Sequence, residues 1–420
     1  MAEFFLGNAM CLRYLFLSLS LVLCGVCGLA AAPTKGLVDS KPEKLRKYES
    51  PYYDIFTDVD PEQARGVVVR MTKMAEEYHD RTKDLFSGTI NQKLPFYLFT
   101  NPEDYYAAGG PEGSIGVFMP GVGRRGSKLM AFTSKTRGGD ISADTWHTIQ
   151  HEGFHQFVHY VVRGNIPVWV NEGMAEYFGE GIFTGDGMIT GAIRPTRCRR
   201  LKAEIKTGYF KSLESMMRTS HFQWNMEMSG LNYDQAWSMC HFLSHGENGK
   251  YQNAFAAFMQ GIGRGQDWQT SWENNFGSAD GFEAKWKAYW ENISETSTDD
   301  LHTKAVVATL TSFLGRAYTQ KQKFDSFDDY IKTDVGALKS SEADWLPPDL
   351  YKHAVMMAKR MQANGYTIAL GARGAGQPTI ICVTPSGQKY VGTFKTSGLR
   401  MAASHAVNVE VSKAKASAGE

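Results

Sequence analysis

Four histidines recur at every fourth position in the stretch HTIQHEGFHQFVH, which spans residues 147–159. They are His147, His151, His155 and His159. On an α-helix each residue advances by about 100°, so two residues four apart lie about 40° from eclipsed. One adjacent pair can therefore hold a single metal ion through both imidazole rings. All four cannot share one ion, because the first and the last point about 120° apart.

Glu152 sets one of the three possible pairs apart from the others. Only His151 is followed directly by a glutamate, so only the stretch HEGFH, residues 151–155, matches the pattern HExxH. In that pattern both imidazoles bind zinc, and the glutamate is placed to take a proton from the attacking water. We therefore interpret His151 and His155 as zinc ligands and Glu152 as a general base.

A catalytic zinc site needs a third protein ligand and one open position. Glu172 and Glu176 lie four residues apart in the downstream stretch PVWVNEGMAEYFGEG, on a second expected helix. Such a helix can present Glu172 to the ion, while Glu176, one turn later, can accept a hydrogen bond from the far nitrogen of a ligand histidine. The alternative is two carboxylates on a solvated helix face, which the apolar neighbours disfavour.

The segments HEGFH and WVNEGMAEYF resemble those of the gluzincin metallopeptidases, which include thermolysin-like enzymes and aminopeptidase N. They are more closely similar to the bacterial secreted "peptidase MA-like" proteins. The resemblance covers residues from about 52 to 293. It implies a thermolysin-like fold and one Zn²⁺ ion bound by His151, His155 and Glu172, with Glu152 as the base.

The same resemblance implies roles for two further residues. Glu176 falls where thermolysin-like enzymes keep an acid behind a ligand histidine. Tyr233, near the start of NYDQAWSMCHFL, falls where aminopeptidases of this clan have a tyrosine whose hydroxyl stabilises the tetrahedral intermediate. A developing oxyanion needs a donor besides the metal. The alternative for Tyr233 is a ring that only packs at a helix start.

Two departures from the family bear on the substrate. Aminopeptidases recognise a free amine with a Gly-x-Met-Glu-Asn strand, and the sequence has no match to it. The oxyanion histidine of the thermolysin type cannot be identified either. We therefore expect cleavage within a polypeptide rather than removal of a terminal residue, with another acyl bond as the alternative.

The other polar clusters have simpler interpretations. His147 and His159 are expected to pack on the helix face or to contact the ligands from behind. His241 and His245 also lie four apart, but HFLSH contains no acid, so we interpret them as structural. The basic run RPTRCRRLK, residues 194–202, is typical of a solvated face, with contact to a substrate carboxylate as the alternative.

Two helices must position the candidate zinc ligands. Ser142 is a suitable N-cap for a helix over residues 142–163, and a second helix is expected from Pro167 to before Gly181. Hydrophobic periodicity predicts strands before these two helices, and further helices before and after them. The strands are expected at 52–59, 93–100, 113–120 and 128–134. The further helices are expected at 61–86, 198–207, 233–246, 250–262, 266–275, 280–293, 305–335 and 350–364.

The N-terminal segment differs from the rest of the chain. Arg13 precedes the apolar run YLFLSLSLVLCGVCGLAAA, which ends in small residues before Pro33. This order is typical of a secretory signal peptide with cleavage near Ala30 or Ala32. An uncleaved membrane anchor is the alternative, because the run approaches spanning length. We expect a secreted, periplasmic or cell-envelope protein, with any membrane contact made only through this segment if it stays uncleaved.

The predicted fold class is α+β. A small N-terminal sheet should pack on a helical, zinc-binding subdomain, followed by a C-terminal region of helices and a three-stranded sheet. The expected organisation is a signal peptide at 1–32, a flexible lead at 33–50, a gluzincin-like metallopeptidase domain at 51–293, a linker at 294–304, a C-terminal α+β region at 305–400 and a loose tail at 401–420.

Composition narrows the choice of partners and covalent links. The chain has 420 residues, a formal net charge of +1 and 43% hydrophobic residues, which suffices for a sizeable core. The balanced charge gives no reason to expect nucleic acid as a partner. Beyond the N-terminal segment the cysteines are Cys198, Cys240 and Cys382, which allow at most one disulfide and match no zinc-site spacing.

These features favour a secreted zinc-dependent peptidase that acts on a peptide or protein. Two alternatives stay open: a module that binds peptide or cell-wall material without cleaving it, and a zinc hydrolase of a non-peptide acyl bond. An intact Glu152 disfavours the binding module, because a binder needs no base.

Overall fold

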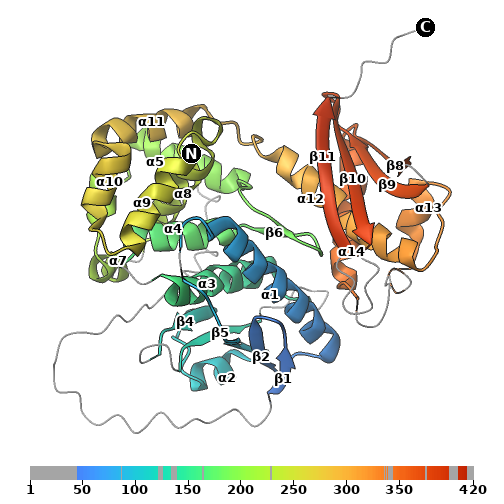
Figure 1. Cartoon of the computed structure of the whole chain (residues 1–420), viewed down its shortest axis with the longest axis horizontal. Coiled ribbons are helices and arrows are strands. Elements are labelled where there is room, and N and C mark those ends of the chain that lie inside the picture. The colour runs from blue at the N-terminus through green and yellow to red at the C-terminus, as the bar shows by residue number, and fades with distance from the viewer. Residues whose placement is uncertain are drawn as a thin grey trace, which may run out of the picture.

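A computed structural model describes residues 45–86, 88–121, 126–133, 140–162, 165–227, 229–334, 336, 338, 344–373, 376–396 and 405–413. The expected signal peptide lies outside these residues. The architecture is α+β, as the sequence predicts, with one sheet near each end of the chain and a helical layer between them (Figure 1). None of the helices in the described ranges is both long and apolar enough to span a bilayer.

The N-terminal sheet has the strand order β1-β2-β3-β5-β4. Its central strands β2, β3 and β5 run parallel, whereas the outer strands β1 and β4 are antiparallel to their neighbours. β4 is therefore an edge strand of this sheet. The bounds are Arg46–Glu49 for β1, Tyr53–Thr57 for β2, Leu94–Phe99 for β3, Gly116–Met119 for β4 and Lys128–Phe132 for β5.

Helix α1, Pro61–Thr82, crosses the sheet and begins where the sequence favours a start. Asp60 caps it by accepting hydrogen bonds from the main-chain N–H groups of Glu62 and Gln63, and Pro61 occupies the first turn. Its buried face joins the core shared by the sheet and the central helices. The short helix α2, Pro102–Ala107, follows β3 and packs on β3 and β5.

Helix α3, Ala143–Val161, confirms the predicted helix at 142–163. The hydroxyl of Ser142 accepts a hydrogen bond from the N–H of Thr145 at 3.1 Å, which satisfies one of the free donors at the helix start. α3 lies between the N-terminal sheet and the helical layer, and it contacts β4, β5 and α4 (Figure 1). Nearly every residue of its HExxH segment is consequently buried.

Helix α4, Val168–Gly179, follows Pro167 and packs against both α3 and α8. Gly173 permits the close approach to α8, Gly230–Gly249, because a Cβ atom there would lie 2.3 Å from the carbonyl oxygen of Ala236. α8 is kinked near its end, where Glu247 and Asn248 have positive φ angles of 49° and 60°. The close α4–α8 contact brings the glutamates of α4 near the first turn of α8.

The remaining helices of the central layer complete an aromatic core with buried Trp169, Trp237, Trp286 and Trp290. The sequence predicts α5, α9, α10 and α11 but gives no prediction for the short helices α6 and α7. The bounds are Pro195–Thr207 for α5, Leu213–Arg218 for α6, His221–Glu227 for α7, Gln252–Gly263 for α9, Trp268–Phe276 for α10 and Ala279–Asn292 for α11.

The C-terminal region has a hydrophobic core of its own. Helix α12, Asp299–Thr319, lies across a sheet of order β11-β10-β9-β8 and packs closely on it at Gly392. Arg316 of α12 pairs with Asp186, between β6 and β7, at 2.8 Å and so ties this region to the segment after α4. The other bounds are Ile182–Phe183 for β6, Met188–Ile189 for β7, Phe327–Lys332 for α13, Pro348–Ala363 for α14, Thr367–Arg373 for β8, Gln377–Val383 for β9, Gln388–Thr396 for β10 and His405–Lys413 for β11.

Several boundary predictions were wrong. The expected flexible lead contains β1, which pairs antiparallel with β2. The expected loose tail contains β11, which pairs with β10 over nine residues and makes the C-terminal sheet four-stranded rather than three-stranded. The expected linker at 294–304 includes the first turns of α12, and the expected helix at 305–335 is two helices, α12 and α13. Cys198, Cys240 and Cys382 are buried free thiols.

Candidate metal centre

Three side chains from two helices meet at one point. Nε2 of His155 lies 3.1 Å from Nε2 of His151, and Oε2 of Glu172 lies 3.4 Å from each of these nitrogens. All three residues are at most 3% exposed. The two histidines come from successive turns of α3, and α4 supplies the glutamate. The structure therefore brings together the three residues that the sequence singles out as ligands.

The triangle fits a small divalent cation better than it fits direct hydrogen bonds. Charge-assisted hydrogen bonds between nitrogen and oxygen are commonly about 2.7–2.9 Å long. Ligand atoms about 2.0–2.1 Å from a tetrahedral zinc lie about 3.3 Å from one another. The 3.4 Å separations match the second spacing, and Oε2 of Glu172 makes no hydrogen bond of ordinary geometry to any described residue. Two imidazoles and a carboxylate are also a donor set that suits zinc.

Glu152 is held in one orientation beside this triangle. It is 1% exposed, and its Oε2 accepts a hydrogen bond of 2.8 Å from the main-chain N–H of Phe118 in β4. Because it follows His151 directly, its side chain leaves α3 about 100° from that ligand. The carboxylate is thus held by the edge strand of the sheet, and among the described residues it belongs to neither group of atoms close enough to share a metal ion.

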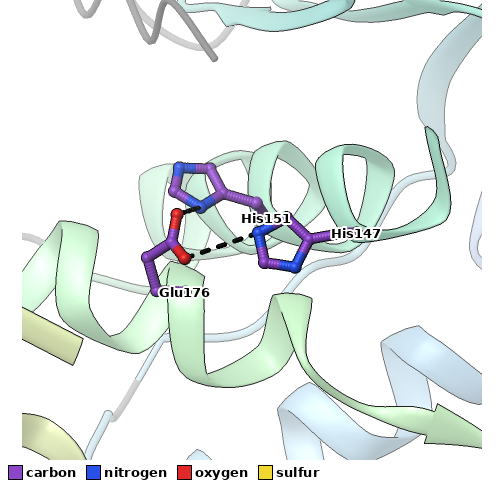
Figure 2. Close-up of side chains that lie close together, drawn as sticks. All are labelled: His147, His151 and Glu176. Atoms are coloured by element: carbon purple, nitrogen blue, oxygen red, sulfur yellow. Dashed lines mark ion pairs between the residues drawn. The ribbon is translucent and has the colours of Figure 1, made fainter. Parts of the chain in front are cut away.

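Glu176 contacts Nδ1 of His151, whereas the triangle is formed at Nε2 of the same ring. Figure 2 shows Glu176 between His151 and His147. Its Oε1 lies 3.1 Å from Nδ1 of His151, and its Oε2 lies 3.4 Å from Nε2 of His147. A carboxylate beside Nδ1 favours the tautomer with the proton on that nitrogen, which leaves Nε2 with its lone pair for a metal. His147 therefore contacts Glu176, the carboxylate behind the candidate ligand His151. A place behind the ligands is one of the two roles expected for His147.

His147, His151 and Glu176 themselves form a second group close enough to hold an ion. The charge next to it argues against that use. Nη2 of Arg197 lies 2.8 Å from Oε2 of Glu176, the oxygen that His147 also approaches. A cation there would lie beside a buried guanidinium, where like charges repel strongly. We conclude that this group orients His151 rather than binding a second metal.

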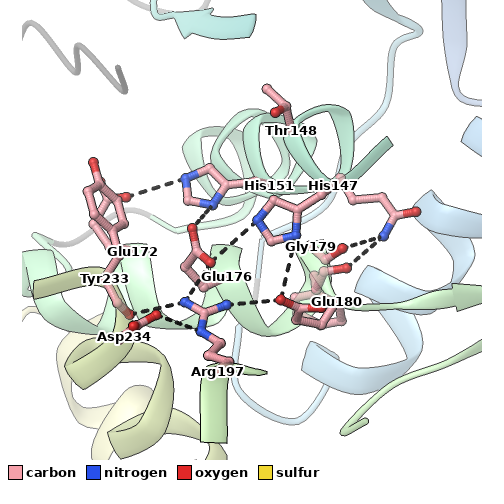
Figure 3. Close-up of polar contacts among 12 residues, drawn as sticks. His147, Thr148, His151, Glu172, Glu176, Gly179, Glu180, Arg197, Tyr233 and Asp234 are labelled. Carbon is pink, nitrogen blue, oxygen red and sulfur yellow. Dashed lines mark hydrogen bonds and ion pairs between the residues drawn. The ribbon is translucent and has the colours of Figure 1, made fainter. Parts of the chain in front are cut away.

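Arg197 lies at the centre of a buried ion-pair network behind the metal centre (Figure 3). Besides Glu176, its guanidinium contacts Glu180 at 3.1 Å and Asp234 at 2.9 Å, and it stacks over the ring of Trp237. Arg194 also pairs with Glu180, and Arg200 pairs with Asp234. The basic run at 194–202 is therefore not simply a solvated face, because Arg197 is buried.

The charges around the site set the protonation of its members. Burial alone would lower the pKa of His151, but contact with Glu172 and Glu176 outweighs burial and raises that pKa to about 10 in the metal-free chain. His151 is then doubly protonated at neutral pH, and a metal that binds Nε2 would displace the proton from that nitrogen. Burial would raise the pKa of Glu172, yet His155 and His151 lower it to about 2. The pKa of Glu176 is likewise held well below its usual value despite burial, chiefly by Arg197. Both carboxylates are therefore ionised at neutral pH and suited to bind cations.

Tyr233 lies in the first turns of α8 with its ring centroid 6.2 Å from that of His151. Trp224 of α7 packs edge-on against the Tyr233 ring. The hydroxyl is buried and makes no hydrogen bond of ordinary geometry to any described residue. Burial and the charge of Glu172 raise its pKa well above the usual value, so the hydroxyl keeps its proton. The indole N–H of Trp224 contacts the hydroxyl oxygen and opposes this rise in pKa, so the proton of the phenol itself is available for donation to a ligand.

The other histidines have roles in packing. His159 lies at the outer end of the ladder, with its ring 5.4 Å from that of Phe118. His241 hydrogen-bonds the carbonyl of Gly191 at 3.0 Å, and His245 contacts the hydroxyl of Tyr177 at 2.9 Å. Burial lowers the pKa of His241 to about 3 and that of His245 to about 4, so both are neutral. This agrees with the structural interpretation of HFLSH.

Sequence reasoning missed four residues of the site region. Glu180 lies four residues after Glu176, and Asp234 directly follows Tyr233. Nothing in the local sequence pattern indicates that Arg197 forms ion pairs with both acids. His221, at the start of α7, is half-buried and lies within electrostatic range of Glu172 and His155; its pKa is lowered, mainly by burial. The only available signal was the density of acids and arginines at 172–204.

Comparison with known proteins gives one similar family and leaves the activity open. A family model described as "Protein of unknown function (DUF1570)" matches residues 145–264. No curated protein matches the chain. The matched segment runs from the first turn of α3 through α9, so it contains every candidate ligand together with Glu152, Arg197 and Tyr233. Over this segment the chain is similar to a family whose function has not been assigned.

Proposed function

We propose that this protein is a secreted zinc-dependent peptidase that cleaves within polypeptide chains. The observation that supports the proposal most strongly is the triangle of His151, His155 and Glu172, with edges of 3.1, 3.4 and 3.4 Å, beside the buried carboxylate of Glu152. A structural zinc would have four protein ligands, whereas a catalytic zinc has three and an open position. Glu152 is held by the N–H of Phe118 rather than by the three candidate ligands, and this supports a catalytic zinc site.

His151, His155 and Glu172 would hold the metal. A zinc ion in such a site polarises the scissile carbonyl and lowers the pKa of a water molecule. Glu176 orients the ring of His151 through the 3.1 Å contact at Nδ1, so that Nε2 of this ring faces the metal site. The surrounding helices exclude bulk water from the ligands, which strengthens every charge interaction at the site.

Glu152 would act as the general base and then as the acid. Its carboxylate takes a proton from the attacking water and later delivers that proton to the leaving amine nitrogen. The hydrogen bond from the N–H of Phe118 holds the carboxylate in place during both transfers. Tyr233 would donate its hydroxyl hydrogen bond to the oxygen that becomes negatively charged when the carbonyl is attacked.

The position of β4 supports a peptide as substrate. β4 is the edge strand of the N-terminal sheet, and Phe118 within it contacts the base directly. A sheet edge can bind an extended peptide by adding it as a further strand. In β4 only Met119 is partly exposed, and the other three residues are buried, so a peptide would meet the edge at this end of the strand. A peptide bound in this way would extend past the site on both sides, as cleavage within a chain requires.

Export of the protein is part of the proposal and rests on residues 1–32. The positive residue, apolar run and small residues before Pro33 are typical of a cleaved signal. Sequencing of the N-terminus of the protein recovered outside the cytoplasm tests it. A start near residue 31 or 33 would support export with cleavage, and a chain that keeps residues 1–32 in the membrane would favour the uncleaved anchor.

Metal analysis of the purified mature chain, paired with digestion of a diverse peptide library, tests the activity. We expect one zinc per chain and cleavage that stops with a chelator and returns with zinc. Zinc without cleavage of any peptide would favour the non-peptide acyl hydrolase or the binding module. Absence of both zinc and cleavage would leave only a metal-free binding module.

A further inference from the structure

We propose that Arg197 is a positioning residue that fixes the candidate ligand His151 and the candidate donor Tyr233 relative to each other. The inference rests on the proposed metal site but concerns a residue to which no role has been assigned. Arg197 comes from α5, whereas the groups it contacts come from α4 and α8. One guanidinium thus joins three helices immediately behind the site (Figure 3).

On one side Arg197 fixes the carboxylate that orients His151. Its Nη2 lies 2.8 Å from Oε2 of Glu176, while the other oxygen of that carboxylate lies 3.1 Å from Nδ1 of His151. Glu176 therefore bridges the guanidinium and the imidazole, one oxygen to each. Because a carboxylate is planar and rigid, fixing one oxygen restricts the direction in which the other can accept a hydrogen bond.

On the other side Arg197 fixes the first turns of α8. Its Nε lies 2.9 Å from Oδ1 of Asp234, the residue that follows Tyr233, and its Nη2 donates to the main-chain carbonyl of Tyr233 at 3.5 Å. The second contact is long and adds little by itself. The ion pair with Asp234 nevertheless links the guanidinium to the residue next to Tyr233, and this link restrains the first turns of α8 relative to α5.

These contacts need the shape of arginine as well as its charge. Arg197 is 5% exposed, and Trp237 stacks on one face of its guanidinium with a centroid distance of 4.5 Å. Its three nitrogens lie 2.8 to 3.1 Å from oxygens of three different acids, although the Nε contact with Asp234 lacks ordinary hydrogen-bond geometry. A lysine ammonium is a point charge without a planar fork, so it cannot keep the same set of contacts. The geometry therefore distinguishes a positioning role from simple charge neutralisation.

The test is the affinity of the full mature chain for zinc, measured by competition with a chromogenic chelator. Arg197→Lys should lower the affinity by about 10–100-fold, as loss of a group behind a ligand does. Circular dichroism and thermal melting in chelator must first show that the metal-free variant is folded. In a Glu176→Gln background the same substitution should have little further effect, because its influence passes through that carboxylate.

Arg200→Lys is the matched control. Arg200 lies on the same helix and also pairs with Asp234, but its side chain is 56% exposed and its ion pair is with Asp234 rather than with Glu176. Its substitution should leave the zinc affinity within about twofold, since exposed ion pairs contribute little. If Arg197→Lys does not fold, Arg197→Gln replaces it and should lower the affinity at least as much, because it also loses the ion pair with Glu176.

Two results separate this inference from the proposed function. If the wild-type chain binds one zinc and folded Arg197→Lys binds it equally tightly, Arg197 does not position the site and the inference is overturned while the zinc site stands. If the wild-type chain binds no zinc, the proposed function fails first, and the inference fails with it. An equal loss for Arg200→Lys would also overturn it, because the effect would then not depend on Glu176.

Discussion

Oε1 of Glu176 lies 3.1 Å from Nδ1 of His151, and both side chains are buried. This contact assigns different tasks to two glutamates that lie one turn apart on α4. Glu172 faces the Nε2 atoms of the two histidines, whereas Glu176 faces the opposite side of one ring. The site is therefore organised in two layers, and substitutions in each layer should have different consequences.

Replacing each glutamate by alanine separates the two layers. Glu172→Ala removes a candidate ligand and should abolish zinc retention at neutral pH. Glu176→Ala should lower zinc affinity by only about 10–100-fold, because the ligands themselves remain. Zinc retention is measured as zinc content after dialysis, and zinc affinity is measured by competition with a chelator. The assignment would be reversed if Glu176→Ala lost the metal outright while Glu172→Ala retained it.

Tyr233→Phe tests whether the phenol takes part in the reaction. The hydroxyl has no ordinary hydrogen bond to a described residue, so its removal should cost little stability and little zinc. Turnover of a confirmed substrate should fall by up to about 10²–10³-fold if the hydroxyl stabilises an oxyanion. Steady-state kinetics should place the loss in kcat. Unchanged kcat would leave Tyr233 with a packing role beside Trp224.

Gly173→Ala tests the close contact between α4 and α8. The added Cβ would lie 2.3 Å from the carbonyl oxygen of Ala236 and 2.7 Å from Sγ of Cys240, so α8 would have to move. We expect a loss of about 1–3 kcal/mol in the free energy of unfolding, as in other overpacked cores.

Gly281→Ala on α11 is the control for this clash, because no atom lies within 4 Å of a Cβ placed there. It should be neutral or stabilise the helix by up to about 1 kcal/mol. Denaturant unfolding of both variants measures the difference. Equal effects of the two substitutions would show that the α4–α8 contact tolerates a methyl group.

Glu204 should make stability depend on pH. Burial, together with the charge of Asp234, raises its pKa to about 7 from an ordinary value of 4.5, and its Oε1 makes no hydrogen bond of ordinary geometry to a described residue. The folded chain thus binds a proton that the unfolded chain releases between these values. The stability contributed by protonated Glu204 is present below about pH 4.5 and is lost as the pH rises through about 7.

Glu204→Gln should consequently raise the melting temperature at pH 8 and leave it nearly unchanged at pH 4. Melting of the variant and of the wild-type chain across this range, in the same buffers, measures the difference. A melting temperature that rose equally at both pH values would show that burial of the charge is not the cause.

The elements that hold the ligands could be predicted because their signals are local. Ser142 caps α3, Pro167 precedes α4, and the four-residue spacings place the side chains on one face of each helix. β1 could not be predicted in the same way, because it is a short, exposed edge strand that exists through pairing with β2. β11 has a local signal in its alternating Val407, Val409 and Val411, although polar residues on both sides favour a loose tail.

The network behind the ligands could not be predicted from local pattern at all. Arg197 is buried only because α4, α5 and α8 converge, and its partners Glu176 and Asp234 are distant from it in sequence. A basic run with several arginines is most often solvated, so composition pointed to the wrong environment. Only the packing of the helices reveals which of the arginines in the run is enclosed.

The most direct test of the central claim is hydrolysis of a peptide library by the zinc-loaded wild-type chain and by zinc-loaded Glu152→Gln, measured side by side. Glu152 is 1% exposed and stands apart from the three ligands, so the variant should keep its zinc and its melting temperature. Its turnover should fall by about 10²–10⁴-fold, which is the usual contribution of a general base. Cleavage of the same peptides at the wild-type rate by the variant would contradict the account, because the proton would then not pass through Glu152.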